Sequence, residues 1–335
     1  MKKHLIAAAV AGALAVPAMA QVTIGGTLEA SYVSQKNADK STKAALNNSL
    51  VGTPNIEFKG SEDLGGGLKA SFVLKDEFDT VSGQDTDSAE AAFDEARISL
   101  SGSFGTVSLG RFDHVGRDIG GVYRFFGDIG RLESSMNYGG STPNIVSYTS
   151  PSFNGFSVAF SDTRGTGRTS TSAYPEKSSS YIIRGDIAGF KVAYASTEAK
   201  TANTGVTKEK VGGFAGSYDF KVAQVGLVSV KREETGSNDV KALGIHAAAP
   251  VGPVTLGFSN TTYEESGNDK ETKIMTLAAK YSFSKRTAVY GTWQKITKDS
   301  AGIANGIDKT RGMDLVTPTS GTSNTGYGIS VEHKF

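Results

Sequence analysis

The amino-acid sequence predicts an all-β protein, a 16-stranded antiparallel transmembrane β-barrel. Three observations predict this fold: an apolar leader at the start of the chain, a period-two alternation of apolar and polar residues after it, and tight turns that alternate with long polar loops. The composition agrees, because 41 glycines, 17 phenylalanines and 12 tyrosines in 335 residues are typical of strands and turns rather than of helices.

The first twenty residues have the pattern of an export signal. Lys2 and Lys3 form a charged head, residues 5–16 are apolar, and Ala18-Met19-Ala20 matches a cleavage site. The apolar run is shorter than the ~20 residues that a membrane-spanning helix needs. We therefore expect residues 1–20 to be a cleaved signal peptide and residues 21–335 to form the barrel after export into the periplasm.

Charge and cysteine usage exclude several classes of protein. The formal net charge of +1 becomes −1 once Lys2 and Lys3 leave with the signal peptide. A near-neutral chain gives no electrostatic case for nucleic-acid binding. The chain has no cysteine, which removes disulfides, thiolate metal sites and thiol nucleophiles. The sequence therefore predicts no nucleic-acid partner and no cofactor.

Alternation of apolar and polar residues runs through the chain after the leader. Phe156, Val158 and Phe160 alternate with smaller or polar residues, and the same pattern recurs at 190–195 and 97–101. Such strands occur in two kinds of protein. One is a secreted soluble β-sandwich or solenoid, and the other is a membrane barrel. The polar face consists of Ser, Thr, Gly, Asn, Lys and Glu, which favours a water-filled lumen over a dry core.

The connections between the strands favour the barrel. Seven tight turns alternate with eight long polar loops, which makes fifteen connections and hence sixteen strands. Short periplasmic turns and long outer loops are the arrangement of outer-membrane barrels, and an even number of strands puts both termini on the periplasmic side. The turns lie at 62–67, 103–105, 152–155, 188–189, 219–221, 250–253 and 284–286, and the loops at 35–52, 80–92, 113–140, 164–179, 199–209, 233–238, 265–270 and 298–324.

The pattern at the end of the chain predicts an amphipathic strand. Tyr327, Ile329, Val331 and Phe335 share one face, and the chain stops on the aromatic residue. A barrel in lipid leaves no open edge, so the last strand must pair with the first. We expect its partner to be residues 21–32.

Four segments resemble the trimeric general-diffusion porins of Gram-negative bacteria, above all their β-proteobacterial branch. They are FKGSEDLGGGLKA at 58–70, LSGSFGTVSLGR at 100–111, YTSPSFNGF at 148–156 and HKF at 333–335. The resemblance covers residues 21–335. It implies a homotrimer in the cell outer membrane that forms a water-filled channel for passive diffusion of small hydrophilic solutes and ions. It also implies contact with outer-membrane lipid and lipopolysaccharide, and a role for Phe335 as part of the signal read by the barrel insertion machinery.

The same resemblance implies that the third outer loop folds into the barrel and narrows it. That loop is 113–140, which we call the inward loop. Opposed charges on the loop and on the wall would set up a transverse field that orients solutes and sets ion preference. The wall candidates are Lys59, Lys75, Glu77, Arg97 and Arg111, and the loop candidates are Asp113, Arg117, Asp118, Arg124, Asp128, Arg131 and Glu133.

Three wall positions complicate this expectation. Strict alternation would turn Arg111 towards lipid together with Leu109, so we expect the strand to bend there. Asn55 and Thr149 stand where many relatives have arginine. By resemblance to the β-proteobacterial branch we expect a weak anion preference, and the alternative is a substrate-specific channel for an anionic solute.

Histidines offer the only route to an enzyme that the sequence leaves open. His114, His246 and His333 follow the leader, and no nucleophile motif or H-E-x-x-H metal pair accompanies them. The glycines at 65–67 lack the lysine of a phosphate loop and fit a hairpin turn. The sequence therefore predicts no enzymatic activity, no catalytic residue and no metal site.

Overall fold

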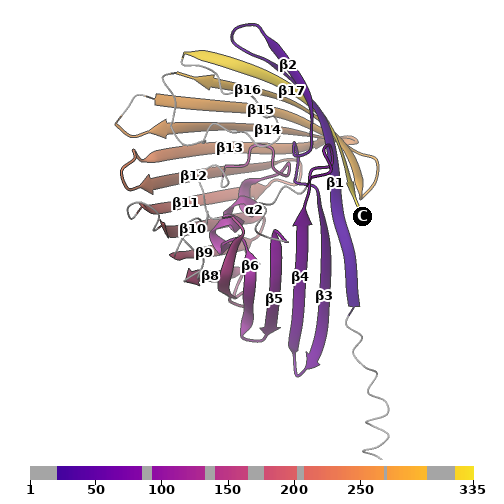
Figure 1. The fold of residues 1–335 in the computed structure, drawn as a ribbon, viewed down its shortest axis with the longest axis vertical. Coiled ribbons are helices and arrows are strands. Elements are labelled where there is room, and N and C mark those ends of the chain that lie inside the picture. Colours follow the sequence, from indigo (N-terminus) through magenta and orange to yellow (C-terminus); the bar gives the residue numbers. More distant parts are fainter. Residues whose placement is uncertain are drawn as a thin grey trace, which may run out of the picture.

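The structure is a computed structural model that describes residues 21–84, 93–132, 140–164, 177–201, 207–267, 270–299 and 321–335. The predicted signal peptide and Glu133 lie outside these residues. All strands of the described residues belong to one antiparallel sheet that curls round and closes on itself (Figure 1). Among the described residues, no helix is both long enough and apolar enough to span a membrane.

The strands follow one another around the barrel in chain order, and consecutive strands pair, except that the second and third strands both pair with the first. Their bounds are β1 (Gln21–Lys36), β2 (Thr42–Asn47), β3 (Asn55–Gly65), β4 (Leu68–Glu77), β5 (Glu95–Gly102), β6 (Gly105–Phe112), β7 (Thr142–Thr149), β8 (Phe156–Arg164), β9 (Lys177–Ile187), β10 (Phe190–Thr201), β11 (Thr207–Asp219), β12 (Gln224–Glu234), β13 (Val240–Val251), β14 (Val254–Glu265), β15 (Lys270–Ser282), β16 (Thr287–Lys298) and β17 (Thr322–Lys334).

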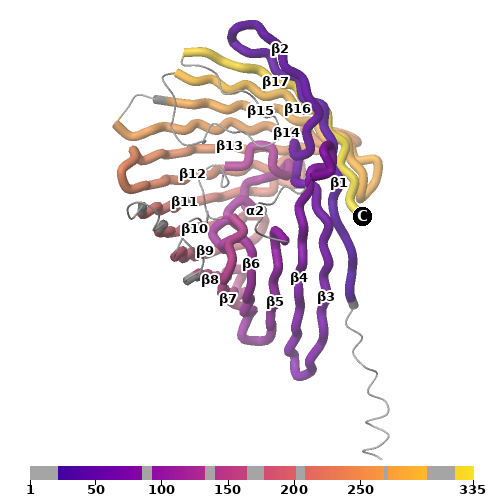
Figure 2. The backbone as a smooth tube through the Cα atoms, in the orientation of Figure 1, coloured from indigo at the N-terminus to yellow at the C-terminus, as the bar shows by residue number. Residues whose placement is uncertain are grey.

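The barrel has sixteen strand positions although it contains seventeen strand segments. β3 pairs with the first part of β1, and β2 pairs with the last part of the same edge. The two short partners therefore share one position, which confirms the 16-stranded barrel. The prediction of a continuous loop at 35–52 was wrong, because β2 interrupts it and forms a hairpin with β1 at the rim of the barrel (Figure 2).

The first and last strands close the barrel, as predicted. Their register runs from Thr27 opposite Lys334 to Lys36 opposite Thr325. The partner of β17 is thus displaced along β1 from the expected 21–32, because the start of β1 pairs with β3 instead. The last residue joins this seam, since the backbone N–H of Phe335 donates to the carbonyl oxygen of Gly26 at 3.1 Å.

The seven predicted tight turns all connect neighbouring strands. The turn between β3 and β4 shows why its sequence is glycine-rich. Gly65, Gly66 and Gly67 have φ values of 80°, 61° and 80°, in the left-handed region that other residues rarely adopt.

The two faces of the barrel differ as a membrane requires. Large apolar side chains point outwards along most strands, for example Ile329 at 62% exposed. The expectation of a polar inner face holds only in part. Between β8 and β16 the inner wall combines polar side chains with many apolar ones, among which Ile182, Ala195 and Val228 are fully or almost fully buried. These residues are covered by protein rather than by water.

Candidate functional site

The inward loop covers part of this wall, which confirms that the third loop folds into the barrel. After β6 the chain forms a 3-10 turn, η1 (Val115–Ile119), and one turn of helix, α2 (Gly120–Tyr123). η1 contacts β8, β9 and β10, whereas α2 contacts β10, β11 and β12. In Figure 1, α2 lies within the ring of strands.

Apolar side chains fasten the loop to the wall. Ile119, Tyr123 and Leu132 have no exposed surface. The hydroxyl of Tyr123 accepts a hydrogen bond from the backbone N–H of Leu132 at 3.1 Å, and its ring packs on His246 with centroids 4.8 Å apart. A loop with this much buried apolar surface is a fixed part of the lumen.

Polar anchors hold the start of the loop against β8 and β9. Nδ1 of His114 is 2.9 Å from the hydroxyl oxygen of Ser161, and the N–H of Gly116 donates to the Ser180 hydroxyl at 2.9 Å. Burial lowers the pKa of His114 to about 4, and the negative charges of Asp113 and Asp162 oppose that shift only in part. The imidazole is therefore neutral at pH 7.

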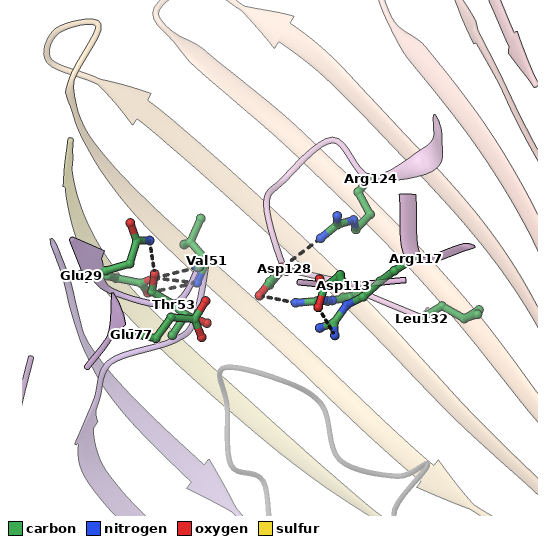
Figure 3. Close-up of polar contacts among 12 residues, drawn as sticks. Glu29, Val51, Thr53, Glu77, Asp113, Arg117, Arg124, Asp128 and Leu132 are labelled. Carbon is green, nitrogen blue, oxygen red and sulfur yellow. Dashed lines mark hydrogen bonds and ion pairs between the residues drawn. The ribbon is translucent and has the colours of Figure 1, made fainter. Parts of the chain in front are cut away.

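A polar cavity of about 640 Å³ lies between the inward loop and the wall formed by β1, β3 and β4. It brings together seven of the predicted charges. The lining includes Asp113, Arg117, Arg124, Asp128 and Arg131 from the loop, and Lys75 and Glu77 from β4. We expect this cavity to form the charged constriction of the channel, and Figure 3 shows several of these side chains facing one another across it.

The loop charges are arranged in pairs. Two guanidinium groups bind the carboxylate of Asp128, that of Arg124 at 2.9 Å (Figure 3) and that of Arg131 at 3.0 Å. Arg117 lies 3.2 Å from Asp113. These pairs fix the directions of long side chains that would otherwise be mobile.

On the wall, Lys75 lies between two carboxylates. Its ammonium is 2.8 Å from Glu77 and 2.8 Å from Asp94. Burial alone would raise the pKa of Asp94, but the Lys75 charge and the hydrogen bonds from Lys75 and Ser141 hold it below its usual value. Asp94 is therefore ionised at neutral pH.

An adjoining cavity of about 460 Å³ shares Lys75, Asp94, Asp113 and Ser141 with the first. It also contains Arg97, Asp118 and Glu95. Arg97 is 3.0 Å from Glu95, and Asp118 is 3.0 Å from Arg184 of β9. Asn55 lines the larger cavity and Thr149 the smaller one, so both unusual wall residues do face the lumen.

Two predicted wall charges lie apart from these cavities. Lys59 is half exposed and pairs with Glu57 at 2.7 Å, and it is not among the described residues that line either cavity. Arg111 is also outside both linings, and its Nε donates to the carbonyl oxygen of Phe93 at 3.0 Å. The expected bend occurs there, because the β6–β7 register shifts between Gly110 and Phe112.

Several lining residues were not predicted, including Glu332 and Lys334 of β17 and two further groups. Asp94 and Glu95 stand where the second loop meets β5, and the charged run DEAR at 94–97 was the available signal. The second group lies in residues 48–53 of the first loop, five of which line the larger cavity. That segment is short and uncharged, so the sequence carried no sign that it enters the lumen.

Comparisons with known proteins agree with this architecture. The Gram-negative porin family matches residues 7–301. Outer membrane porin protein 32 of Delftia acidovorans is 30% identical over 100% of both chains, and the major outer membrane protein P.IB of Neisseria meningitidis serogroup B is 27% identical over 100% of both. The anion-selective porin from Comamonas acidovorans superposes with a TM-score of 0.81 at 26% identity, over 94% of this chain and 100% of that one. The similarity thus spans the whole barrel.

Proposed function

The chain belongs to the Gram-negative porin family, and on that premise we propose how its constriction selects solutes. As an outer-membrane porin, it is a channel through which small hydrophilic solutes and ions diffuse passively. We propose that the charges lining the two cavities set its ion preference, and that this preference is weakly towards anions.

The position of the loop arginines carries this proposal. Arg117, Arg124 and Arg131 line the larger cavity, and the loop carboxylates beside them, Asp113 and Asp128, are bonded by those same guanidinium groups. The loop charges that line the cavity are thus three guanidinium groups against two carboxylates, and this local excess of positive charge favours a permeating anion. The solved Comamonas acidovorans relative is described as anion-selective, which supports the same direction.

Single-channel recording in planar bilayers tests the preference directly. With a salt gradient across the bilayer, we expect a reversal potential of the sign that anion permeation produces. The potential should depend on salt, because screening shortens from about 10 Å at 0.1 M to about 3 Å at 1 M. A reversal potential of the opposite sign would show that the wall carboxylates dominate, and it would reject the proposal.

A substrate-specific channel for an anionic solute is the second candidate, and the same loop arginines favour it. Such a channel would contain a saturable site. Adding a small dicarboxylate or inorganic phosphate would then block chloride current with a defined half-saturation concentration. A current that varies only with ionic strength supports the general channel.

We also propose a homotrimer, in which the outer faces of the first and last strands contribute to the subunit contact. Crosslinking and native mass measurement in mild detergent should give the trimer mass. We propose contacts of this assembly with lipopolysaccharide, and a role for Phe335 in recognition by the insertion machinery. Deleting Phe335 should reduce insertion in cells.

Residues 1–20 are proposed to be a cleaved signal peptide. Sequencing the N-terminus of protein purified from outer membranes should give Gln21 as the first residue. The proposal assigns no catalytic role to any residue, and detectable hydrolysis of lipid or peptide by the purified protein would contradict it.

A further inference from the structure

Glu29 is a lumenal carboxylate of β1 that takes no part in the charge pairs of the constriction. Its side chain points inwards, and the residue is only 1% exposed. Oε1 accepts hydrogen bonds from the N–H groups of Leu50 at 2.8 Å and Val51 at 3.0 Å, and from the Ser330 hydroxyl at 2.7 Å. Oε2 accepts from the N–H of Val51 at 3.1 Å and of Gly52 at 2.8 Å.

These donors belong to residues 48–53, which we call the lumenal segment. It follows β2 and lies inside the barrel. Leu50 is 2% exposed and packs over Gly328 of β17, where any side chain at position 328 would overlap it. Val51 is equally well buried. Three backbone N–H groups of the lumenal segment donate to the Glu29 carboxylate, so the barrel wall holds this segment in place.

The other side of the lumenal segment contacts the inward loop. The backbone N–H of Asp128 donates to the carbonyl oxygen of Val51 at 2.6 Å. Gly127 comes so close to the same oxygen that a Cβ would overlap it, and its φ of 56° is left-handed. Figure 3 shows Glu29 and Val51 on one side and Asp128 with Arg124 on the other. The chain of contacts runs from Glu29 through Val51 to the residue that orients two arginines.

The geometry points to Glu29 as a positioning residue of the channel, which holds the lumenal segment inside the barrel and thereby fixes the tip of the inward loop. Two loops thus narrow the channel, and the lumenal segment holds Asp128 of the inward loop in place. This inference deepens the channel function proposed above and rests on it.

A carboxylate is the group that this position requires. Each of its oxygens has two lone pairs, so the pair can accept all of the converging donors. Glutamine in its place would present an NH₂ group to N–H donors on one side, leaving them without an acceptor. Glu29→Gln therefore releases the segment while changing the volume of the side chain very little.

The rate of thiol labelling measures release of the lumenal segment independently of channel conductance. The chain has no cysteine, so Val51→Cys introduces a single thiol in the lumenal segment. In folded Val51→Cys protein we expect slow reaction with a charged thiol reagent. Adding Glu29→Gln should speed the reaction by about tenfold or more, the factor that one hydrogen bond to a charged group contributes to an equilibrium. The matched control is Glu271→Gln, a β15 glutamate paired with Lys273, which should leave the rate unchanged.

Conductance provides the second readout. Glu29→Gln should raise single-channel conductance and current noise, and Glu271→Gln should not. Equal labelling rates in folded Val51→Cys proteins with and without Glu29→Gln would overturn the inference even if the channel conducts normally. Faster labelling with unchanged conductance would show that the segment is held by Glu29 but does not set the constriction, which also overturns it.

If the Glu29→Gln protein fails to insert into the membrane, a second variant tests the same inference. Leu50→Asp places a carboxylate beside Glu29 and alters only the loop, so no strand is changed. It should release the lumenal segment and raise conductance in the same way. A folded Leu50→Asp channel with wild-type conductance and noise would reject the role proposed for Glu29.

Discussion

Lys75 is the positive charge between two wall carboxylates, and we predict that the ion preference of the channel depends on it. Its ammonium neutralises charge on both Glu77 and Asp94 at 2.8 Å. Lys75→Gln leaves the Glu77 and Asp94 side chains facing the lumen without their positive partner and should move the reversal potential towards cations. The shift should shrink in concentrated salt because of screening.

Lys59→Gln is the matched comparison for Lys75→Gln. Lys59 pairs with one carboxylate, Glu57, and lies outside the lining of both cavities. We expect a clearly smaller change in reversal potential. If the two variants shift the potential equally, selectivity arises from the whole lumen and not from the constriction.

His114 makes the attachment of the inward loop depend on pH. Its pKa in the folded protein is about 4, against about 6.5 in an unfolded chain, so the unfolded state binds a proton more readily. The free energy of unfolding is therefore unaffected by titration of His114 above about pH 6.5, and it decreases as the pH falls from there towards 4. The difference corresponds to about 3 kcal/mol as an upper bound.

Urea unfolding of the barrel at pH 7 and pH 4.5 measures this dependence. His114→Gln keeps a hydrogen-bond partner for Ser161 but does not titrate, so its stability should fall less over that interval than that of the wild type. All other titratable groups are present in both proteins, so the comparison isolates the contribution of position 114. Parallel losses of stability in the two proteins would contradict the assignment.

At the scale of elements, the inward loop is held mainly by buried apolar side chains. Tyr123 of α2 contacts His246 of the wall through its ring and Leu132, near the end of the described part of the loop, through its hydroxyl. Tyr123→Ala should remove on the order of 3 kcal/mol of loop anchoring and raise conductance and noise, whereas Tyr123→Phe loses one hydrogen bond, about 1 kcal/mol. Recordings of both variants test this, with deletion of residues 121–130 as the upper limit. A folded Tyr123→Ala channel that conducts like the wild type would show that the wall alone sets the pore.

Strands and tight turns could be predicted because their signals are local. Alternation such as Phe156, Val158 and Phe160 sets the strands, and glycines at 65–67 set a turn. The position of the lumenal segment could not be predicted from local sequence, because contacts with Glu29 and Asp128, which are distant in sequence, place Leu50 and Val51. The apolar inner wall was missed for a similar reason: Ile182 is buried by a loop from elsewhere in the chain.

The candidate site was predictable to a similar degree. The resemblance to porins identified the inward loop, and five of its predicted charges line the larger cavity together with Lys75 and Glu77. Position along a strand did not reveal that Lys59 and Arg111 lie outside both linings, because depth in the lumen depends on strand tilt and on the bulge at Gly110. The roles of all these charges in ion selection stay predictions.

At the scale of the whole molecule, the barrel reverses the usual arrangement of a soluble protein. Lipid replaces water around its outer surface, and part of its interior is wet. Closure of β1 on β17 satisfies the backbone along the seam between the two ends of the sheet, which a membrane requires. The outward side chains therefore determine whether the closed sheet is stable in a bilayer.

Ile245 tests this dependence on the lipid face. It lies in the middle of β13, points outwards, and is flanked by Leu227 on β12. Ile245→Arg should destabilise the barrel in lipid vesicles by about 2–4 kcal/mol, the cost of an arginine near the bilayer midplane. Val222→Arg, in the exposed turn between β11 and β12, keeps the charge change but places it in water, and it should cost little. Urea titrations of folding into vesicles measure both. Equal losses would mean that Ile245 faces a protein surface rather than lipid, and would place the subunit contact on β12 and β13 instead of on the first and last strands.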